Sequence, residues 1–124
     1  MIVKNHPLSY LYRADDLRAF FDQYGWDQVA LGYDFANGYF GREEAEAVLR
    51  IQNRVRFLYA ADTLLDTFQH AQIGTGTVAF DKIAAMLHAA EFCRPTILEI
   101  VADDPEPAIN ASIARLDSMH WPAG

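Results

Sequence analysis

Short apolar runs alternate along the chain with longer segments in which apolar residues recur every three or four positions. The short runs predict strands over residues 2–6, 28–34, 55–59 and 96–101. The longer segments predict helices over residues 15–24, 42–52, 79–92 and from Pro105 onward. Glycines at 38 and 41 predict a loop before the second helix. Strands that alternate with helices pair in parallel through right-handed crossovers, so the pattern predicts an α/β fold of four βα units.

Each predicted strand carries a polar or ionisable side chain near its carboxyl end; these residues are Lys4, Asp34, Tyr59 and Glu99. Side chains two positions apart share a face of a strand, which places Val55 and Phe57 on the face of Tyr59. Active sites of parallel sheets and barrels are built at the carboxyl ends of the strands. Glu99 lies in an apolar strand, where a carboxylate is costly unless it is paired or metal-bound.

Composition narrows the class of protein. A chain of 124 residues, 52% of them hydrophobic, has room for one domain with a sizeable core. Its net charge of −7 disfavours binding to a nucleic-acid backbone. No apolar run is long enough to span a membrane, and the single cysteine, Cys93, cannot form an internal disulfide. We therefore expect a cytoplasmic protein that binds neither membrane nor nucleic acid.

Two architectures fit four βα units: a small open sheet covered on both faces, or part of a β/α barrel. A doubly wound open sheet would usually carry a glycine fingerprint after its first strand, and this chain has none there. The open sheet implies a function of its own, that of a small α/β regulator. It is a third alternative to the two functions given at the end of this subsection.

Four segments of the chain resemble the second half of the xylose isomerase-like TIM barrels, a family of sugar and sugar-phosphate isomerases and epimerases with endonuclease IV relatives. IVKNHP is similar to the fifth barrel strand, LGYDFAN to the sixth, VRFLYAADT to the seventh, and IGTGTVAFDKIAAML with TILEIV to the eighth and its approach. The resemblance implies that residues 1–124 form one half-barrel domain, half of a TIM (β/α)8 barrel. We expect residues 118–124 to be a loose tail.

The resemblance also implies a divalent metal, Mn, Co, Mg or Zn, held by Glu, Asp, His and Glu at the ends of these strands. Asp34 and Glu99 match two of the ligands. Lys4 stands in place of the first glutamate and Tyr59 in place of the histidine. Family enzymes use the metal and glutamates to move a proton between adjacent carbons, so Glu99 and Lys4 are the candidate catalytic residues.

The same resemblance places Asn37 and Asp62 at polar family positions and His70 in an active-site loop, while His6 shares the strand face of Lys4. These four residues are the candidate substrate-binding set. His6 could also replace a lost metal ligand. The Gly74–Gly76 loop is either a simple turn or an anion site on backbone amides.

A lysine at a metal-ligand position has a direct physical consequence, because it adds a positive charge where a cation should bind. We expect the Lys4 ammonium to lie between Asp34 and Glu99 and to keep both ionised. The alternative is a Lys4 amine that acts as a Schiff-base nucleophile, which requires a lowered pKa.

The resulting prediction is a sugar (phosphate) isomerase- or epimerase-like protein that acts on a small carbohydrate and whose metal-assisted chemistry is impaired. The alternative is a non-catalytic binding or assembly module. A half barrel leaves its inner sheet face and two edges open, so we expect a homo-oligomer or a complementary half barrel as partner.

Overall fold

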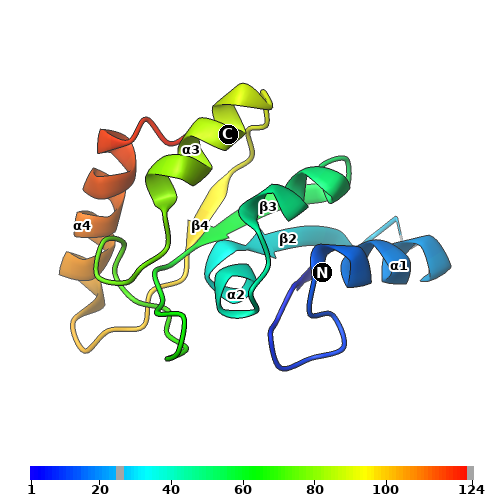
Figure 1. Cartoon of the computed structure of the whole chain (residues 1–124), viewed down its shortest axis with the longest axis horizontal. Coiled ribbons are helices and arrows are strands. Elements are labelled where there is room, and N and C mark those ends of the chain that lie inside the picture. Colours follow the sequence, from blue (N-terminus) through cyan, green and yellow to red (C-terminus); the bar gives the residue numbers. More distant parts are fainter. Residues whose placement is uncertain (25–26, 123–124) are drawn as a thin grey trace.

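The sheet of this protein is entirely parallel, with its four strands in the order in which they occur in the chain. A computed structural model describes residues 1–24 and 27–122. The strands are β1 (Ile2–Lys4), β2 (Ala30–Asp34), β3 (Val55–Ala60) and β4 (Thr96–Leu98). The helices are α1 (Ala14–Tyr24), α2 (Phe35–Phe40), the 3-10 helix η1 (Ala45–Ile51), α3 (Phe80–Ala89) and α4 (Pro105–Ser118) (Figure 1). The predicted series of four βα units is confirmed.

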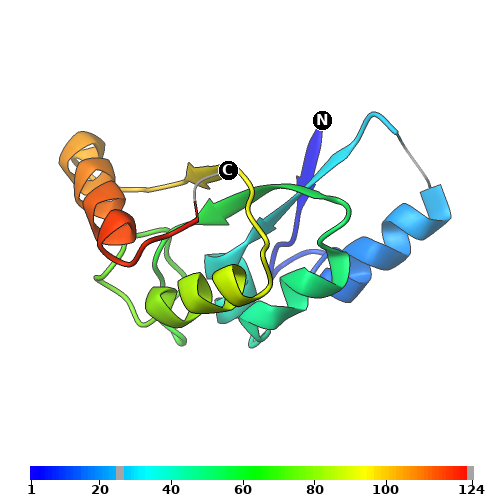
Figure 2. The same cartoon turned by 90° about the horizontal axis from the view of Figure 1, so that it is seen from above.

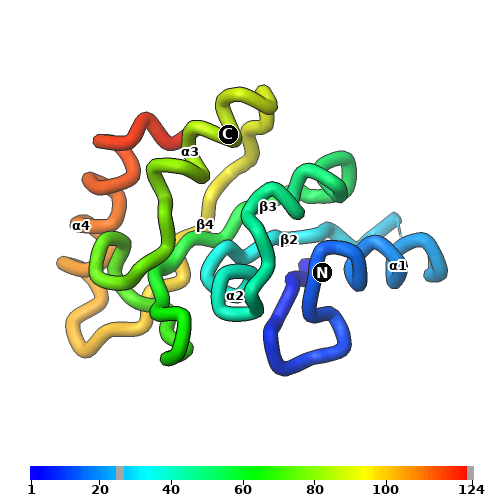
Figure 3. Tube along the Cα trace, in the orientation of Figure 1, coloured from blue at the N-terminus to red at the C-terminus, as the bar shows by residue number. Residues whose placement is uncertain are grey.

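The helices α1, α2, η1 and α3 lie on one side of the sheet, α4 lies beyond its β4 edge, and the other face of the sheet is bare (Figure 2). The trace in Figure 3 runs from β1 at one edge of the sheet to β4 at the other, with α4 beyond it. Leu31, Tyr33 and Leu58 point from the strands into the helical layer and are almost fully buried there. The α1 stripe of Leu17 and Phe21 packs into the same core. Burial of apolar area against the helices therefore fixes which sheet face is inner and which is outer.

A bulge in the sheet corrects one prediction about strand faces. Leu31 pairs with Val55 but the next residue, Gly32, pairs with Phe57, so β3 carries one extra residue at this point. Val55 therefore turns to the helix-covered face and is fully buried. The prediction that Val55 shares the inner face with Phe57 and Tyr59 is wrong for Val55.

The segment between β2 and β3 also differs from the prediction. In place of a loop over 38–41, Asp34 caps the short helix α2, its Oδ1 accepting a hydrogen bond from the Asn37 N–H at 3.0 Å. In place of a helix over 42–52, the chain forms the shorter 3-10 helix η1. The segment between β2 and β3 therefore forms two short helices, α2 and η1, where the sequence predicted a loop followed by one helix.

The expected loose tail over 118–124 is ordered as far as residue 122. Ser118 ends α4. The Trp121 ring lies edge-on to Phe35 at 5.8 Å and tilted against Phe80 at 5.9 Å. Its Nε1–H donates to Thr96 Oγ1 at 2.8 Å. The expectation is therefore wrong for 118–122, and residues 123–124 lie outside the described part.

Among the described residues, no helix has the length and apolar character that crossing a membrane demands.

Candidate functional site

Three charged side chains meet on the bare face of the sheet at the carboxyl ends of its strands. The Lys4 Nζ donates to Asp34 Oδ2 at 2.9 Å and also to Glu99 Oε2. The Asp34 side chain is almost fully buried, whereas that of Glu99 is 44% exposed. The predicted position of Lys4 between the two carboxylates is confirmed.

An aromatic ring supports the Lys4 ammonium from β3. The Nζ lies 4.4 Å from the centroid of the Tyr59 ring, a distance at which the ring attracts a cation. The ring needs the space above Gly32, because a Cβ at Gly32 would lie 2.6 Å from Tyr59 Cε2. The glycine on β2 thus allows the tyrosine, at the position where the family resemblance places a histidine, to lie beneath the lysine.

The electrostatics of this cluster keep the lysine charged. Burial alone would lower the pKa of Lys4, but the charges and hydrogen bonds of Asp34 and Glu99 outweigh it and raise the pKa above its ordinary value. A nucleophilic lysine requires the opposite shift. The Schiff-base interpretation therefore has no support in the geometry.

Two asparagines hold the backbone of Asp34 in place. Asn5 receives the Asp34 N–H on its Oδ1 at 2.8 Å and donates its Nδ2 to the Asp34 carbonyl at 3.1 Å. Asn37 donates its Nδ2 to the Asn5 carbonyl at 2.8 Å. All three residues are buried, so this clamp joins the end of β1 to the start of α2. Asn37 positions Asp34 in this arrangement, and its binding of substrate stays a prediction.

His70 enters the cluster from the connection between β3 and α3. Its Nε2 lies 3.0 Å from Asn37 Oδ1 and 3.7 Å from Asp34 Oδ2, and its Nδ1 lies 3.7 Å from Glu99 Oε1. Because the Asn37 Nδ2 donates to Asn5, its Oδ1 is an acceptor and the His70 Nε2 carries the proton. Asp34, His70 and Glu99 form the one group of three acidic, histidine or cysteine ligands that the described residues bring within 4.8 Å.

The ligand atoms of Asp34, His70 and Glu99 do not fit a divalent metal ion in this arrangement. The Lys4 ammonium donates hydrogen bonds to both carboxylates and therefore occupies the space between them, where a divalent ion would bind. The proton on the His70 Nε2 points to Asn37, which leaves only the Nδ1 as a nitrogen ligand. A divalent ion would have to share the two carboxylates with a fixed positive charge at hydrogen-bond distance.

His6 lies outside this ligand group and does not replace a lost ligand. Its Nδ1 accepts from the Leu8 N–H at 3.2 Å, and its ring packs edge-on against Phe68 at 5.9 Å. The Phe68 ring also lies edge-on to His70, at 5.3 Å. Phe68 thus links the two histidines, and the binding of substrate by His6 and His70 stays a prediction.

Asp62 has a structural role in the fold, and its predicted contact with substrate stays a prediction. It is buried, and its carboxylate accepts hydrogen bonds from the backbone N–H groups of Thr63, Gly74 and Val78 at 2.8–3.1 Å. The N–H groups of Thr75 and Thr77 are also bonded within the protein. These bonds favour a turn organised by Asp62, and the alternative of an anion site on the amides of the loop stays untested.

Asn5 contributes to the site without having been predicted, and its signal was weak, since it is a polar residue between an apolar strand and Pro7. His70 was expected to bind substrate from an active-site loop, but its place beside Asp34 and Glu99 has no signal in the sequence, because a long loop carries it there.

Comparisons with known proteins agree with this architecture. The model of the family described as "Xylose isomerase-like TIM barrel" matches residues 2–119. The fold is similar to a D-tagatose 3-epimerase-like protein (TM-score 0.77, 17% identity) and to an L-ribulose 3-epimerase (0.75, 14%), each over 94% of this chain. A 3-keto-D-glucoside 4-epimerase from E. coli is similar over 86% of this chain (0.66, 22%). No curated protein matches significantly in sequence.

The chain spans less than half the length of these structures: 45%, 46% and 40% of them, respectively. Four parallel strands alternating with helices over that share correspond to half of a barrel. The family match covers nearly the whole chain. This protein therefore belongs to the xylose isomerase-like TIM barrel family, of which it has a half-barrel fold.

Proposed function

We propose that this chain binds a small carbohydrate or polyol at the carboxyl ends of its strands and that the metal-assisted proton transfer of its family is impaired. The observation that carries the proposal is the Lys4 ammonium, which donates to both Asp34 and Glu99. An internal cation that neutralises the two carboxylates takes the place that a divalent ion would need.

The chemistry of the cluster suits a polyhydroxylated ligand. An ammonium has three protons, and two of those on Lys4 are given to carboxylates, so the third can reach a ligand hydroxyl. The half-exposed Glu99 carboxylate supplies acceptors. The ring of Phe68, 36% exposed, offers an apolar surface beside His70. The similar structures named as a D-tagatose 3-epimerase-like protein and an L-ribulose 3-epimerase support the choice of ketoses as the first ligands to test.

Thermal melts with manganese test the impaired metal site. We expect the wild-type chain to gain almost no melting temperature from Mn²⁺, since a ligand stabilises only in proportion to its concentration over its Kd. The double variant Lys4→Glu/Tyr59→His restores the ligand types of the family and should gain a Mn²⁺-dependent rise. Lys82→Glu, the same charge change at the other lysine of the chain, is the matched control. Stoichiometric metal in the wild-type protein by elemental analysis would refute the proposal.

Ketose binding is tested separately by NMR titration with D-tagatose, L-ribulose and the polyol glucitol. We expect amide shifts centred on residues around Lys4 and His70, without conversion of either ketose when Mn²⁺ is added. Shifts confined to other surfaces would refute binding at this site. Mn²⁺-stimulated epimerisation by the wild-type chain would refute impairment and favour a working metalloenzyme.

The alternative function, a non-catalytic assembly module, is favoured by the two open edges of the sheet at β1 and β4 and by the 42% exposure of Ile2 on its bare face. We propose that a second copy or a complementary half barrel covers this face. Light scattering of the purified chain tests this: an oligomer supports self-association. A stable monomer that binds no hydrophobic dye contradicts it.

A further inference from the structure

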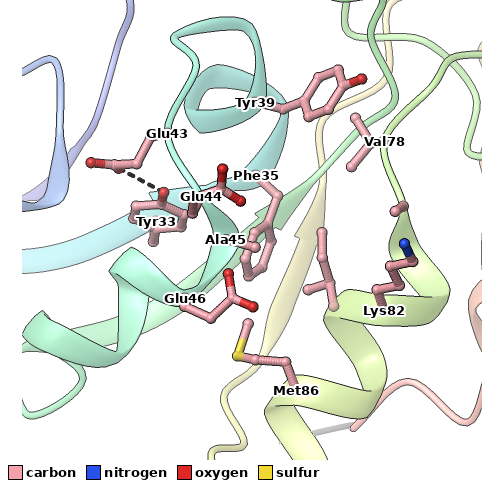
Figure 4. Close-up of a pocket in the computed structure, with 12 residues that line it drawn as sticks. Tyr33, Phe35, Tyr39, Glu43, Glu44, Ala45, Glu46, Val78, Lys82 and Met86 are labelled. Carbon is pink, nitrogen blue, oxygen red and sulfur yellow. Dashed lines mark hydrogen bonds between the residues drawn. The ribbon is translucent and has the colours of Figure 1, made fainter.

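A cavity lies on the outer, helical side of the protein, away from the lysine cluster. It is about 180 Å³ in volume and opens between η1 and α3 (Figure 4). That volume corresponds to about six water molecules at liquid density. Phe35, Val78 and Ile83 provide apolar walls, and the Tyr39 hydroxyl is hydrogen-bonded to Thr77 Oγ1 at 3.0 Å. The cavity is thus a small apolar recess with a tyrosine at one end.

The rim of this cavity is acidic. Glu44 and Glu46 line it from the η1 side, across from Lys82 and Met86 on α3 (Figure 4). Both glutamates are exposed, and neither forms an ion pair in the part of the chain that the structure describes. Lys82 is exposed as well and likewise pairs with no carboxylate there. Two unpaired carboxylates against one lysine leave the rim with a negative excess.

A third carboxylate borders the cavity from within. Glu43 is 9% exposed and accepts the Tyr33 hydroxyl at 2.7 Å and the Ala14 N–H at 3.1 Å, and it forms no ion pair with the residues that the structure describes. Burial and the charge of Glu43 raise the pKa of Tyr33 well above its usual value. A buried negative charge without a counter-ion strengthens the field at the recess, because few water molecules screen it.

We propose that this cavity binds a small organic cation, a primary ammonium or guanidinium on a short alkyl chain. The alkyl part fits the walls of Phe35, Val78 and Ile83, and Met86 can adjust its shape to it. The cationic head lies at the rim, close to Glu44 and Glu46. The volume admits one short chain, which favours a free small amine over a larger molecule.

The site is complete within this chain. The walls come from β2, α2, η1, α3 and the segments that join them, on the side of the sheet opposite the bare face. Whatever covers the bare face or completes a barrel leaves these walls unchanged. The proposal is therefore independent of carbohydrate binding at the lysine cluster.

Three probes of equal chain length separate charge from size: n-butylammonium, 1-butanol and butyrate. We expect n-butylammonium to shift the amide NMR signals of residues 43–46 and 78–86 in a saturable manner. The neutral alcohol should bind more weakly at the same place, and the anion should not bind. The n-butylammonium affinity should fall with added salt, because the rim charges are exposed.

Conservative variants of the rim test the role of its charges. Glu44→Gln and Glu46→Gln each remove one exposed charge and should weaken n-butylammonium about two- to fivefold, the range for exposed ion pairs, while 1-butanol is unaffected. Glu106→Gln, an exposed glutamate on α4 outside the cavity, is the matched control and should change nothing. Unchanged circular dichroism melts confirm that the variants fold.

Three outcomes overturn the proposal. Equal binding of all three probes shows a non-selective apolar recess. Shifts of n-butylammonium that centre on the amides around Asp34 and Glu99 place the cation at the lysine cluster. Binding of Nα-acetyl-lysinamide more than about tenfold tighter than n-butylammonium assigns the recess to a lysine side chain of a protein partner.

Discussion

Replacing Lys4 by methionine keeps an unbranched side chain only one atom shorter and removes the charge that joins Asp34 to Glu99. In this variant the buried Asp34 carboxylate loses the donor at 2.9 Å on its Oδ2 and keeps the Asn37 N–H on its Oδ1. Loss of a hydrogen bond between charged groups costs about 1.5–3 kcal/mol, and removal of one partner of a fully buried pair about 3–5 kcal/mol.

Because Lys4 and Glu99 are partly exposed to solvent, we expect the loss in the free energy of unfolding to lie at the lower end of these values. The Lys4 side chain is 23% exposed and that of Glu99 is 44% exposed, so water stabilises the freed Glu99 at little cost. Most of the loss therefore falls on Asp34, whose side chain is 1% exposed. We expect Lys4→Met to lower the free energy of unfolding by about 2–3 kcal/mol.

Urea denaturation followed by circular dichroism at pH 7 measures this loss. With a slope of about 1.5 kcal/mol per molar urea, the midpoint should fall by about 1.3–2 M. Lys82→Met, at the exposed lysine, should stay within about 0.5 kcal/mol of the wild type. Adding Asp34→Asn to Lys4→Met should recover stability, because no buried charge is then left unpaired. A Lys4→Met midpoint equal to that of Lys82→Met would refute the internal-cation account.

Three further predictions concern the parts of the fold that support the site. Gly76→Ala should destabilise the protein by about 3 kcal/mol or more in the same urea assay, since a Cβ there would lie 2.4 Å from Asp62 Oδ1 and disrupt hydrogen bonds to a buried carboxylate. Above about pH 10 the unfolded chain loses a tyrosine proton that Tyr33, with its raised pKa, retains in the folded state, so stability should fall by about 1.4 kcal/mol per pH unit. Tyr33→Phe should remove that part of the alkaline decline in pH-dependent urea titrations, whereas Tyr10→Phe, at a fully exposed tyrosine, should not. Trp121→Ala should lower the melting temperature and cost about 2–3 kcal/mol, because the ring is packed but not fully buried.

The order of the elements and the meeting of Lys4, Asp34 and Glu99 could be predicted from the sequence. Both depend on local periodicity and on one rule, that parallel strands present their carboxyl ends at one edge of the sheet. Once β1, β2 and β4 are parallel strands of one sheet, with β3 between β2 and β4, the side chains at their carboxyl ends lie along the same edge of the sheet. Neither prediction requires that the path of a connecting loop be known.

The parts that could not be predicted depend on contacts between distant segments. The bulge that turns Val55 to the helix-covered face depends on how β3 pairs with β2, which no window of sequence contains. His70 reaches the cluster through the path of a long connection, and Trp121 packs against Phe35 although 86 positions separate their residue numbers. Tertiary contacts override the local pattern in each case.

The clamp of Asn5 and Asn37 on Asp34 has an evolutionary consequence. Neither Lys4 nor Tyr59 takes part in it, so both can change while the position of Asp34 is maintained. Codons for lysine and glutamate differ by a single base, as do codons for tyrosine and histidine. Single-base mutations can therefore replace the Lys4 ammonium by a carboxylate and the Tyr59 ring by an imidazole. The hydrogen bonds of Asn5 and Asn37 that hold Asp34 are the same before and after such changes.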